Sequence, residues 1–160
     1  MTIQPGQTVL LTGASGGLGV FMARALADKG LKLALLAYPG TGLDELQKEV
    51  ERRGVKAVSF VVDLCDPAQR SQVLQEVETK FGAIDILVNN AGIEHTAAYH
   101  ELREEHLREI ISVNFEAPMY LARQFLPGML ERKRGHIINI SSLAGRSGPA
   151  FQEPYAATKA

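Results

Sequence analysis

Near its N-terminus the chain reads Thr8-Val-Leu-Leu-Thr-Gly-Ala-Ser-Gly-Gly-Leu-Gly19, an apolar run followed at once by a glycine-rich turn. Glycine permits positive φ and close backbone approach, and a helix beginning at Gly17 would present free N–H groups and a positive dipole end to a pyrophosphate. The spacing is Gly-x-x-x-Gly-x-Gly, not the strict Gly-x-Gly-x-x-Gly fingerprint. Taken alone, such a turn is equally well a plain tight turn. Its place between a strand and a helix favours phosphate binding.

Outward from this turn, short apolar runs alternate with amphipathic tracts, a pattern typical of β-α-β units in a parallel sheet. The expected strands are residues 8–11, 32–37, 57–62, 84–89 and 136–140, and the expected helices are residues 17–29, 43–53 and 67–81. A long helical tract over 101–133 contains Pro118 and Pro127, so we expect two segments or a kink. The pattern predicts an α/β doubly wound sheet in the order 3-2-1-4-5, in one domain over residues 1–160.

The overall composition is that of an ordinary globular protein: of 160 residues, 46% are hydrophobic and 22% charged, and the net charge is -1. Without a basic excess, neither a nucleic acid nor a membrane surface is an expected partner. Cys65 is the only cysteine, which excludes an internal disulfide or a multi-thiolate metal site and suits a reducing compartment. Residues 1–6 lack the features of a signal peptide, and no later stretch is long enough to span a bilayer. We therefore expect a cytoplasmic protein.

The final residues, Tyr155-Ala-Ala-Thr-Lys159-Ala160, place a phenol and an ammonium group one helical turn apart. Side chains at i and i+4 share a helix face, so the lysine can hold its charge beside the phenol. A free tyrosine has a pKa of about 10, and a nearby cation favours the phenolate, which suits proton exchange at neutral pH. Most pairs at this spacing are merely solvated surface, so the interpretation depends on the rest of the chain.

Further polar elements occur at later strand ends and in the long helical tract: Asp63-Leu64, Asn89-Asn90-Ala91-Gly92, Asn114 and Ser141-Ser142. Together with the glycine turn and the terminal pair, they resemble the short-chain dehydrogenase/reductase family in its compact single-domain form. The resemblance covers essentially every residue. It implies a Rossmann-type sheet and an NAD(P)-dependent oxidoreductase that interconverts a secondary alcohol and a ketone. The implied partner is a small-molecule alcohol or carbonyl substrate.

The resemblance also implies site residues. Tyr155 would exchange a proton with the substrate oxygen, and Lys159 would favour its phenolate and hydrogen-bond the nicotinamide ribose. Ser142 would hydrogen-bond the substrate oxygen, and Asn114 would position a water that links Lys159 to solvent. The cofactor would carry the hydride. The residues implied for cofactor binding are Gly13, Ser15, Gly17, Leu18, Gly19, Tyr38, Asp63, Leu64, Asn90, Gly92, Tyr155 and Lys159.

Several of these positions have plainer interpretations. Ser142 can simply cap a strand end, and Asn114 can be an ordinary helix residue. Asp63 can be a turn-former ahead of Pro67, although it resembles the family's residue that meets the adenine amino group. Asn90 can do structural work between the central strands while its loop shapes the adenosine pocket.

The end of the second strand bears on the choice between NAD(H) and NADP(H). An acid there would hydrogen-bond the ribose 2′-hydroxyl and select NAD, whereas an arginine would accommodate a 2′-phosphate. The matching residues are Ala37 and Tyr38, so no carboxylate repels a phosphate and Tyr38 can pack on the adenine or ribose. No basic residue completes a phosphate clamp, because Gly16 stands at another place where a cation often lies. On balance we expect NADP(H) to be preferred over NAD(H).

Four histidines raise the question of a metal site: His95, His100, His106 and His136. They lack a compact ligand spacing, and His106 lies in the charged run 103–109, which is typical of a solvated helix face. No metal site is therefore expected. His95 follows the Asn-Asn-Ala-Gly turn, where it either faces the substrate or is an ordinary loop residue.

Family members normally continue beyond the tyrosine–lysine helix, so we expect this chain to be C-terminally incomplete and to lack the family's last strands. The helix carrying that pair would have under two turns, and the fifth strand would keep an unpaired edge. We expect residues 146–160 to be poorly ordered or repacked. The alternative function is a non-catalytic nucleotide-binding or assembly fragment that needs a partner for the missing part. By resemblance, a homo-oligomer paired through the long helix after the fourth strand is also expected.

Overall fold

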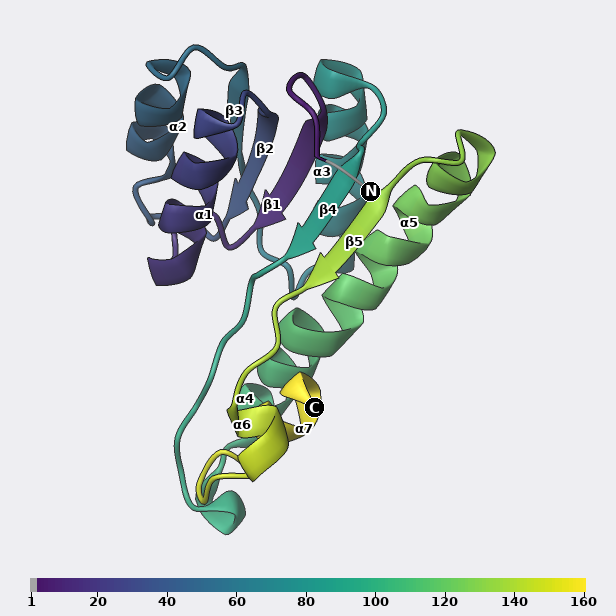
Figure 1. The fold of residues 1–160 in the computed structure, drawn as a ribbon. Helices are drawn as coiled ribbons and strands as arrows, with labels where there is room; N and C mark the ends of the chain where they lie inside the picture. The colour runs from purple at the N-terminus through teal and green to yellow at the C-terminus, as the bar shows by residue number, and fades with distance from the viewer. Residues whose placement is uncertain (1–2) are drawn as a thin grey trace.

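The computed structural model describes residues 3–160 and shows a sheet with helices on both faces (Figure 1). Met1 and Thr2, which begin the segment where no signal peptide is expected, lie outside the described residues. The strands are β1 (Thr8–Thr12), β2 (Lys32–Ala37), β3 (Ala57–Val61), β4 (Ile86–Asn89) and β5 (His136–Asn139). The helices are α1 (Gly17–Asp28), α2 (Leu43–Glu51), α3 (Pro67–Phe81), α4 (Glu104–Ile111), α5 (Ala117–Glu131), α6 (Ala144–Ser147) and α7 (Glu153–Lys159). A 3-10 turn, η1 (Tyr99–Glu101), precedes α4, and a π-helical segment, η2 (Ser112–Glu116), joins α4 to α5.

The five strands run parallel in the order β3-β2-β1-β4-β5, which confirms the predicted topology. Leu10 of the central strand β1 lies opposite Ala34 of β2 and Leu87 of β4. The chain first builds outward from β1 to β3 and then crosses to β4. The strand order therefore reverses between β1 and β4, and in such sheets ligands bind beyond the carboxyl ends of the strands at this point.

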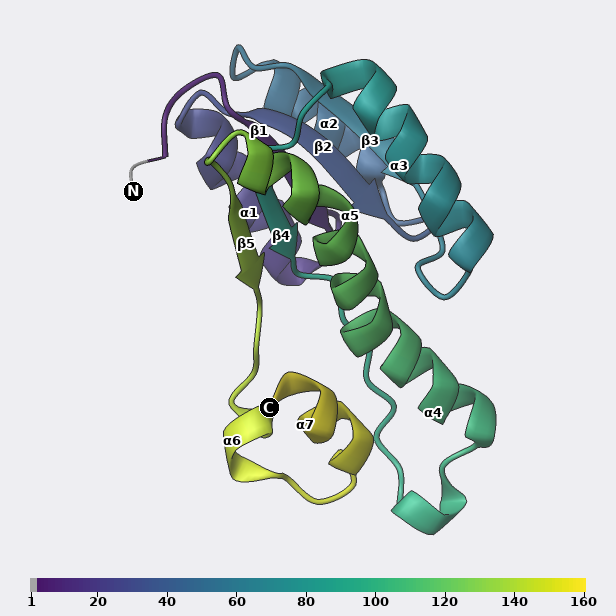
Figure 2. The same cartoon turned by 90° about the vertical axis from the view of Figure 1, so that its right-hand side faces the viewer.

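Alternate strand residues face two separate hydrophobic cores, because successive side chains point to opposite faces of a sheet. Val9 and Leu11 pack in the core that α1 and α2 cover. Leu10 and Leu36 pack in the core that α3 and α5 cover. Figures 1 and 2 show these two helical layers on opposite faces of the sheet. Burial of one leucine side chain stabilises the fold by about 2 kcal/mol. Because each core buries several strand residues, the strands and the polar motifs at their ends are held in place.

The start of α3 is set by Asp66, which directly precedes the helix. Its carboxylate accepts hydrogen bonds from the backbone N–H groups of Ala68 and Gln69 and from the Gln69 side chain. The hydrogen bond from the Gln69 side chain, followed by those from the two backbone groups, lowers the pKa of Asp66. Pro67 occupies the first turn, where no backbone donor is required. Asp66 thus fixes the start of α3 a few residues after β3 ends and shortly after the Asp63-Leu64 segment.

The long helical tract is continuous from α4 through η2 to α5 and extends beyond the sheet (Figure 2). The expectation that both prolines interrupt it is wrong for Pro127, which lies inside α5. Buried Leu121 and Met129 anchor the helix on either side of it, so packing holds the tract despite the missing donor. Pro118 lies in the first turn of α5, directly after the π-helical segment. Across residues 3–160, no helix combines the length and apolar character needed to cross a membrane.

The last two helices lie beyond the carboxyl end of β5 and pack on each other, and α7 also packs on α4 (Figure 2). The expectation that residues 146–160 are poorly ordered or repacked is wrong, because α7 is formed and Pro154, Ala156 and Lys159 are buried. The Ser141 hydroxyl donates a hydrogen bond to the Lys159 carbonyl at 2.5 Å. Packing therefore stabilises a helix that is too short to persist alone. Among the described residues β5 pairs only with β4, so the expected unpaired strand edge is present.

Candidate active site

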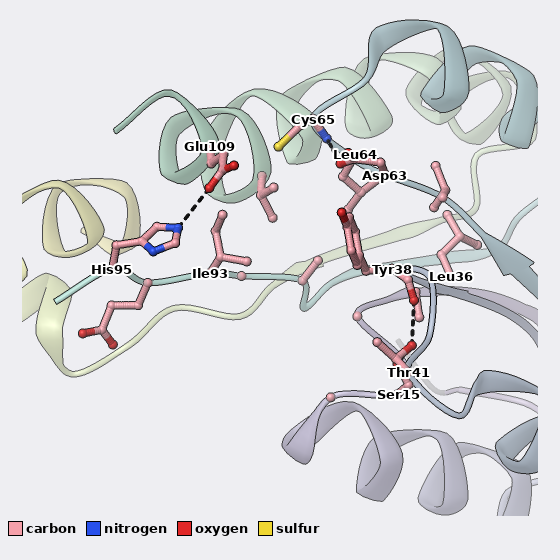
Figure 3. A pocket seen from close by; sticks show the side chains of 18 residues that line it. Ser15, Leu36, Tyr38, Thr41, Asp63, Leu64, Cys65, Ile93, His95 and Glu109 are labelled. Carbon is pink, nitrogen blue, oxygen red and sulfur yellow. Dashed lines mark hydrogen bonds and ion pairs between the residues drawn. The ribbon is translucent and has the colours of Figure 1, made fainter. Parts of the chain in front are cut away.

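A cavity of about 540 Å³ opens at the carboxyl ends of β1 to β4, and half of the twelve predicted nucleotide-binding residues line it (Figure 3). Its lining comprises Gly13, Ser15, Gly16, Leu36, Ala37, Tyr38, Thr41, Val62, Asp63, Leu64, Cys65, Ala91, Gly92, Ile93, Glu94, His95, Glu109 and Val113. This volume is in the range of small-molecule sites, which span about 300–1,000 Å³. Six of the predicted cofactor residues are in the lining: Gly13, Ser15, Tyr38, Asp63, Leu64 and Gly92.

The glycine turn is held against the loop that follows β4. Gly13 has a φ of +62°, and a Cβ there would lie 2.8 Å from the Cα of Ala91, so only glycine fits without strain. The Asn90 side chain donates hydrogen bonds to the carbonyls of Thr12 and Gly13, each at 3.0 Å. The Thr12 hydroxyl in turn accepts from the backbone N–H groups of Asn90 and Ala91. In this structure Asn90 positions the turn and lies outside the cavity lining, and Thr12 is a supporting residue that the sequence motifs did not reveal.

Gly17, Leu18 and Gly19 form the first turn of α1, next to the cavity and outside its lining. A helix N-terminus carries unpaired N–H groups and partial positive charge. Leu18 has 56% of its surface exposed. The sequence prediction of a phosphate-binding turn therefore has the strand–turn–helix context that it requires.

Hydroxyl groups replace an acid beside the end of β2. Tyr38 lines the cavity with 62% of its surface exposed. The Thr41 hydroxyl donates to the Tyr38 carbonyl at 2.7 Å and lies 2.7 Å from the Ser15 hydroxyl (Figure 3). Thr41 was not predicted, because only the three-dimensional turn after β2 brings it back to the glycine loop. In the cavity lining Ala37 ends β2 and Tyr38 follows it, and Asp63 follows the neighbouring strand β3.

At the end of β3, Asp63 shapes the cavity wall through its own backbone turn. Its carboxylate accepts from the Cys65 N–H at 2.8 Å, and its N–H donates to the Gln69 side chain at 3.0 Å. Asp63 thus forms a turn, as its plainer interpretation predicts. It also lines the cavity. Burial, followed by the charges of Asp63 and Glu109, raises the pKa of the Cys65 thiol to about 11. Cys65 is accordingly a protonated wall residue at neutral pH.

A buried arginine ties this wall to the π-helical segment. Arg70 is 2% exposed and donates to the Leu64 carbonyl at 2.7 Å and to the Glu116 carboxylate at 2.8 Å. Its guanidinium also lies 3.4 Å from the Ser112 hydroxyl and 5.5 Å from the centroid of the Tyr120 ring. Because Ser112 and Glu116 begin and end η2, Arg70 fixes that segment relative to the cavity.

Asn114 lies within η2 and is 6% exposed. Its side-chain oxygen accepts from the Ile93 N–H, and its side-chain nitrogen donates to the Ile93 carbonyl, both at 2.9 Å. The same nitrogen donates to the Thr158 hydroxyl at 3.1 Å, which reaches α7. Asn114 is therefore no ordinary helix residue, since it joins the loop after β4 to the helix that carries Tyr155.

Lys159 is 8% exposed, and its ammonium group donates to the Ile140 carbonyl at 3.1 Å. Burial lowers its pKa. The ammonium nitrogen lies 5.9 Å from the centroid of the Tyr155 ring. A Cβ added at Gly92, a residue of the main cavity lining, would lie 3.0 Å from the same nitrogen. Lys159 thus stands where the cavity meets α7.

Among the four predicted catalytic residues, the contacts in the described part of the chain link Asn114, Tyr155 and Lys159 through α7 but do not reach Ser142. Asn114 and Lys159 both line a second cavity of about 240 Å³. The Ser142 hydroxyl accepts from the Ala144 N–H at 3.2 Å, which is a turn contact at the start of α6. Among residues 3–160, no hydrogen bond joins Ser142 to Tyr155. Tyr155 is half-buried on α7 and is not part of the main cavity lining.

Residues 7–160 match the family model of short chain dehydrogenase. The ketoacyl reductase HetN of Nostoc sp. is 41% identical over 160 residues, which cover 100% of this chain and 56% of that protein. The 3-oxoacyl-[acyl-carrier-protein] reductase FabG of Thermotoga maritima is 34% identical over 155 residues, which cover 97% of this chain and 63% of that protein. The chain thus spans a little over half the length of these relatives.

Solved structures agree with the sequence comparison. A metagenomic short-chain oxidoreductase in complex with NADP superposes with a TM-score of 0.92 at 37% identity, covering 98% of this chain and 71% of that one. NAD+-bound xylitol dehydrogenase superposes with a TM-score of 0.90 at 28% identity, covering 99% of this chain and 61% of that one. Both nicotinamide cofactors therefore occur among proteins of this architecture.

Proposed function

Because the chain belongs to the short-chain dehydrogenase family, we propose that it interconverts a secondary alcohol and a ketone with a nicotinamide cofactor. The observation that carries this proposal is the position of Lys159 between two features, the Tyr155 ring on its own helix and Gly92 in the cavity lining. At Lys159, a cofactor bound in the cavity would lie next to Tyr155, the proton donor on α7.

The residues present fit a dinucleotide. The backbone at Gly13 passes so close to Ala91 that a side chain is excluded, and the first turn of α1 follows directly. We propose that Gly13, Ser15 and the start of α1 hold the pyrophosphate. The wall formed by Tyr38, Asp63 and Leu64 would receive the adenosine, and Asn90 would keep the turn and wall together. Gly92, Tyr155 and Lys159 would border the nicotinamide end. When bound, the nicotinamide supplies the hydride in reduction and accepts it in oxidation.

The roles of the side chains follow from their chemistry. In reduction the Tyr155 hydroxyl gives its proton to the carbonyl oxygen, and in oxidation the phenolate takes a proton from the substrate hydroxyl. The buried Lys159 ammonium stabilises the phenolate by its charge. The Ser142 hydroxyl donates a hydrogen bond to the substrate oxygen as negative charge develops there. Asn114 holds α7 through Thr158 and orders water toward Lys159 in the cavity that both residues line.

We propose that NADP(H) is preferred over NAD(H). The support comes from the end of β2, where Ala37 takes the place of an acid and the hydroxyls of Ser15 and Thr41 lie 2.7 Å apart. These hydroxyls can turn to donate to a 2′-phosphate, and no carboxylate stands at the end of β2 itself to repel it. The expected result is a lower Kd for NADPH than for NADH in a fluorescence titration. Ala37→Asp is expected to invert this order; equal effects on both cofactors would contradict the assignment.

A 3-oxoacyl thioester is the first substrate to assay. The reductases of Nostoc and Thermotoga maritima that the chain resembles carry ketoacyl names. Leu143, next to Ser142, is 78% exposed, and Phe151 is 54% exposed, so both offer apolar surface to an acyl chain near α7. The relatives are longer than this chain. That this chain shares their ketoacyl reductase activity is therefore also a proposal.

The test is a steady-state assay of the purified chain with NADPH and NADH against ketones that include 3-oxoacyl thioesters. Turnover that depends on a ketone supports the oxidoreductase. Nucleotide binding without any turnover would instead support the alternative, a nucleotide-binding assembly fragment that needs a partner. Absence of both nucleotide binding and turnover would contradict both functions.

A further inference from the structure

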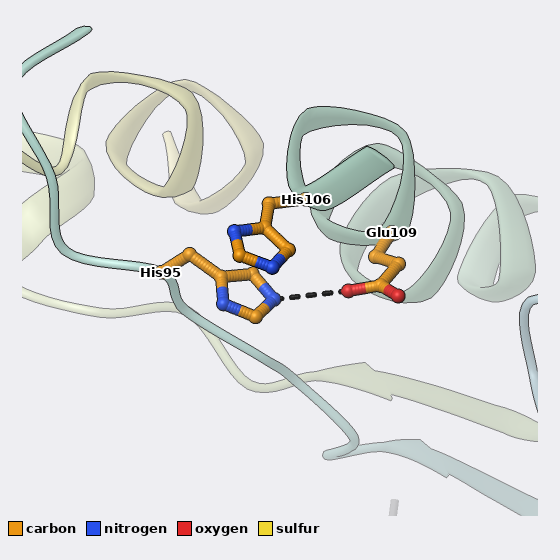
Figure 4. Close-up of side chains that lie close together, drawn as sticks. All are labelled: His95, His106 and Glu109. Carbon is orange, nitrogen blue, oxygen red and sulfur yellow. Dashed lines mark hydrogen bonds and ion pairs between the residues drawn. The ribbon is translucent and has the colours of Figure 1, made fainter. Parts of the chain in front are cut away.

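Three side chains that can each offer a metal ligand, His95, His106 and Glu109, lie close together (Figure 4). Two of them, His95 and Glu109, line one end of the main cavity. His95 comes from the loop after β4, whereas His106 and Glu109 lie on α4. One imidazole nitrogen of each histidine and one carboxylate oxygen of Glu109 all lie within 4.8 Å of one another. His95 Nε2 is 3.0 Å from the Glu109 carboxylate, and the two imidazole rings stack at 3.8 Å between centroids. We call these three residues the His95 cluster.

We propose that the His95 cluster is a site for a divalent transition-metal ion of the Zn²⁺ type. Two imidazole nitrogens and one carboxylate oxygen are ligands that Zn²⁺ favours, and three protein ligands leave one position of a tetrahedron open. His106 and Glu109 are three residues apart on a helix and therefore share one face. The hydrogen bond between His95 and Glu109 already holds two of the ligands together. This inference does not depend on the proposed oxidoreductase function.

Metal binding requires only small rearrangements at half-exposed side chains. The two rings are within 6° of parallel, so their nitrogen lone pairs run side by side and one ring must turn to share an ion. The Arg103 guanidinium contacts Nε2 of His106 and must leave it. Arg103 has 62% of its side chain exposed and also pairs with Glu105 at 2.9 Å, so an alternative partner is already at hand. Arg103 is thus the competitor of the metal at this site.

A bound ion would connect the loop after β4 to α4. His95 and Glu109 line the main cavity, and Ile93 in the same loop is held by Asn114. The ion would therefore fix one wall of the cavity from the side opposite Tyr38 and Thr41 (Figure 3). Such a link would couple metal binding to the position of the loop after β4, which forms part of the cavity wall.

The test uses the untagged 160-residue chain, with Zn²⁺ followed by calorimetry and Co²⁺ by its visible absorption. We expect one equivalent of metal to bind. His106→Ala and Glu109→Gln should each weaken binding by about tenfold or more, since even the loss of a partner that merely supports a ligand costs this much. His100→Ala is the matched control, because His100 is close in sequence, 83% exposed and outside the cluster. It should leave the affinity unchanged.

Arg103→Ala supplies a test with the opposite sign. Removal of the competing guanidinium should increase the affinity for Zn²⁺, whereas a purely structural role of Arg103 predicts no such gain. Circular dichroism confirms that each variant is folded. Equal Zn²⁺ affinities for wild type, His106→Ala, Glu109→Gln and His100→Ala would overturn the proposal, as would the absence of binding by a folded wild-type chain.

Discussion

Lys159 keeps its ammonium group inside the protein, where the Ile140 carbonyl accepts its hydrogen bond at 3.1 Å. Among residues 3–160 no carboxylate forms an ion pair with it. Burial lowers the pKa of Lys159, which means that the folded protein disfavours the charged form. We therefore predict that Lys159→Met abolishes turnover and raises the free energy of unfolding at pH 7, as measured by urea denaturation.

The pH dependence of this gain has a definite sign. The folded pKa lies below the unfolded value of about 10.4, so the charged lysine destabilises the fold at pH values below the folded pKa. That penalty disappears as the pH rises toward the unfolded value. The stability advantage of Lys159→Met should accordingly shrink between pH 7 and pH 10. A variant that is less stable than wild type at both pH values would show that Lys159 serves mainly to hold the fold together.

Site residues could be predicted from the sequence where they lie close together in it and form a motif. The spacing of Tyr155 and Lys159 pointed to one helix face, and the structure places both on α7. The His95 cluster was not predictable, because His95 and His106 meet only after η1 and its flanking loops turn the chain back. Thr12 and Thr41 were missed for the same reason, since their hydroxyls act across neighbouring loops.

At the scale of elements, α6 packs so tightly on α7 that one position tolerates only glycine. A Cβ at Gly145 would lie 2.1 Å from the carbonyl oxygen of Lys159. Gly145→Ala should therefore displace α7 and destabilise the protein by about 1–3 kcal/mol, the range typical of overpacking. Urea denaturation measures the loss, and turnover should fall with it because α7 carries Tyr155.

Gly128 of α5 is the matched control, since it is also a helical glycine. A Cβ there would meet only the guanidinium of Arg132, 2.9 Å away on a flexible side chain. Gly128→Ala should stabilise the protein by up to about 1 kcal/mol through helix propensity. If both substitutions stabilise the protein equally, the tight packing of α6 on α7 does not exist in solution.

Strand order and most elements followed from hydrophobic periodicity, because β1 and β4 are apolar runs buried on both faces. The long tract was harder. Proline alone suggested a break near Pro127, yet packing of Leu121 and Met129 carries α5 through it. The local irregularity is instead η2, which frees Asn114 to bond the loop after β4, and nothing in the sequence period marks a π-helical turn. Disorder was expected at α7 because a helix of under two turns is unstable alone. Tertiary packing stabilises it instead.

For the whole molecule, exposed apolar side chains along the α4–α5 tract bear on association. Five of them recur at helical spacing: Ile111, Phe115, Met119, Leu126 and Leu130, with exposures of 45%, 54%, 60%, 43% and 66%. We call them the apolar stripe, and we propose that two copies of the chain pair through it. The homo-oligomer expected from the sequence would use this helix, so the apolar stripe is the surface on which to test it.

Sedimentation velocity tests the pairing. Met119→Lys places a charge in the middle of the apolar stripe and should shift the protein from dimer to monomer, because a buried unpaired ammonium is costly. Phe21→Lys is the control, since Phe21 on α1 is similarly exposed at 65% and lies outside the stripe. A wild-type monomer at all concentrations, or equal effects of both variants, would contradict pairing through α4 and α5.

In the proposed reaction α7 supplies the proton for reduction at a nicotinamide site. Measuring the rate of ketone-dependent NADPH consumption by wild type and by Tyr155→Phe isolates the role of the Tyr155 hydroxyl. Loss of the hydroxyl is expected to lower the rate by about 100-fold or more, the usual contribution of a general acid, while the Kd for NADPH stays the same. A Tyr155→Phe variant that consumes NADPH at the wild-type rate would show that Tyr155 is not the proton donor.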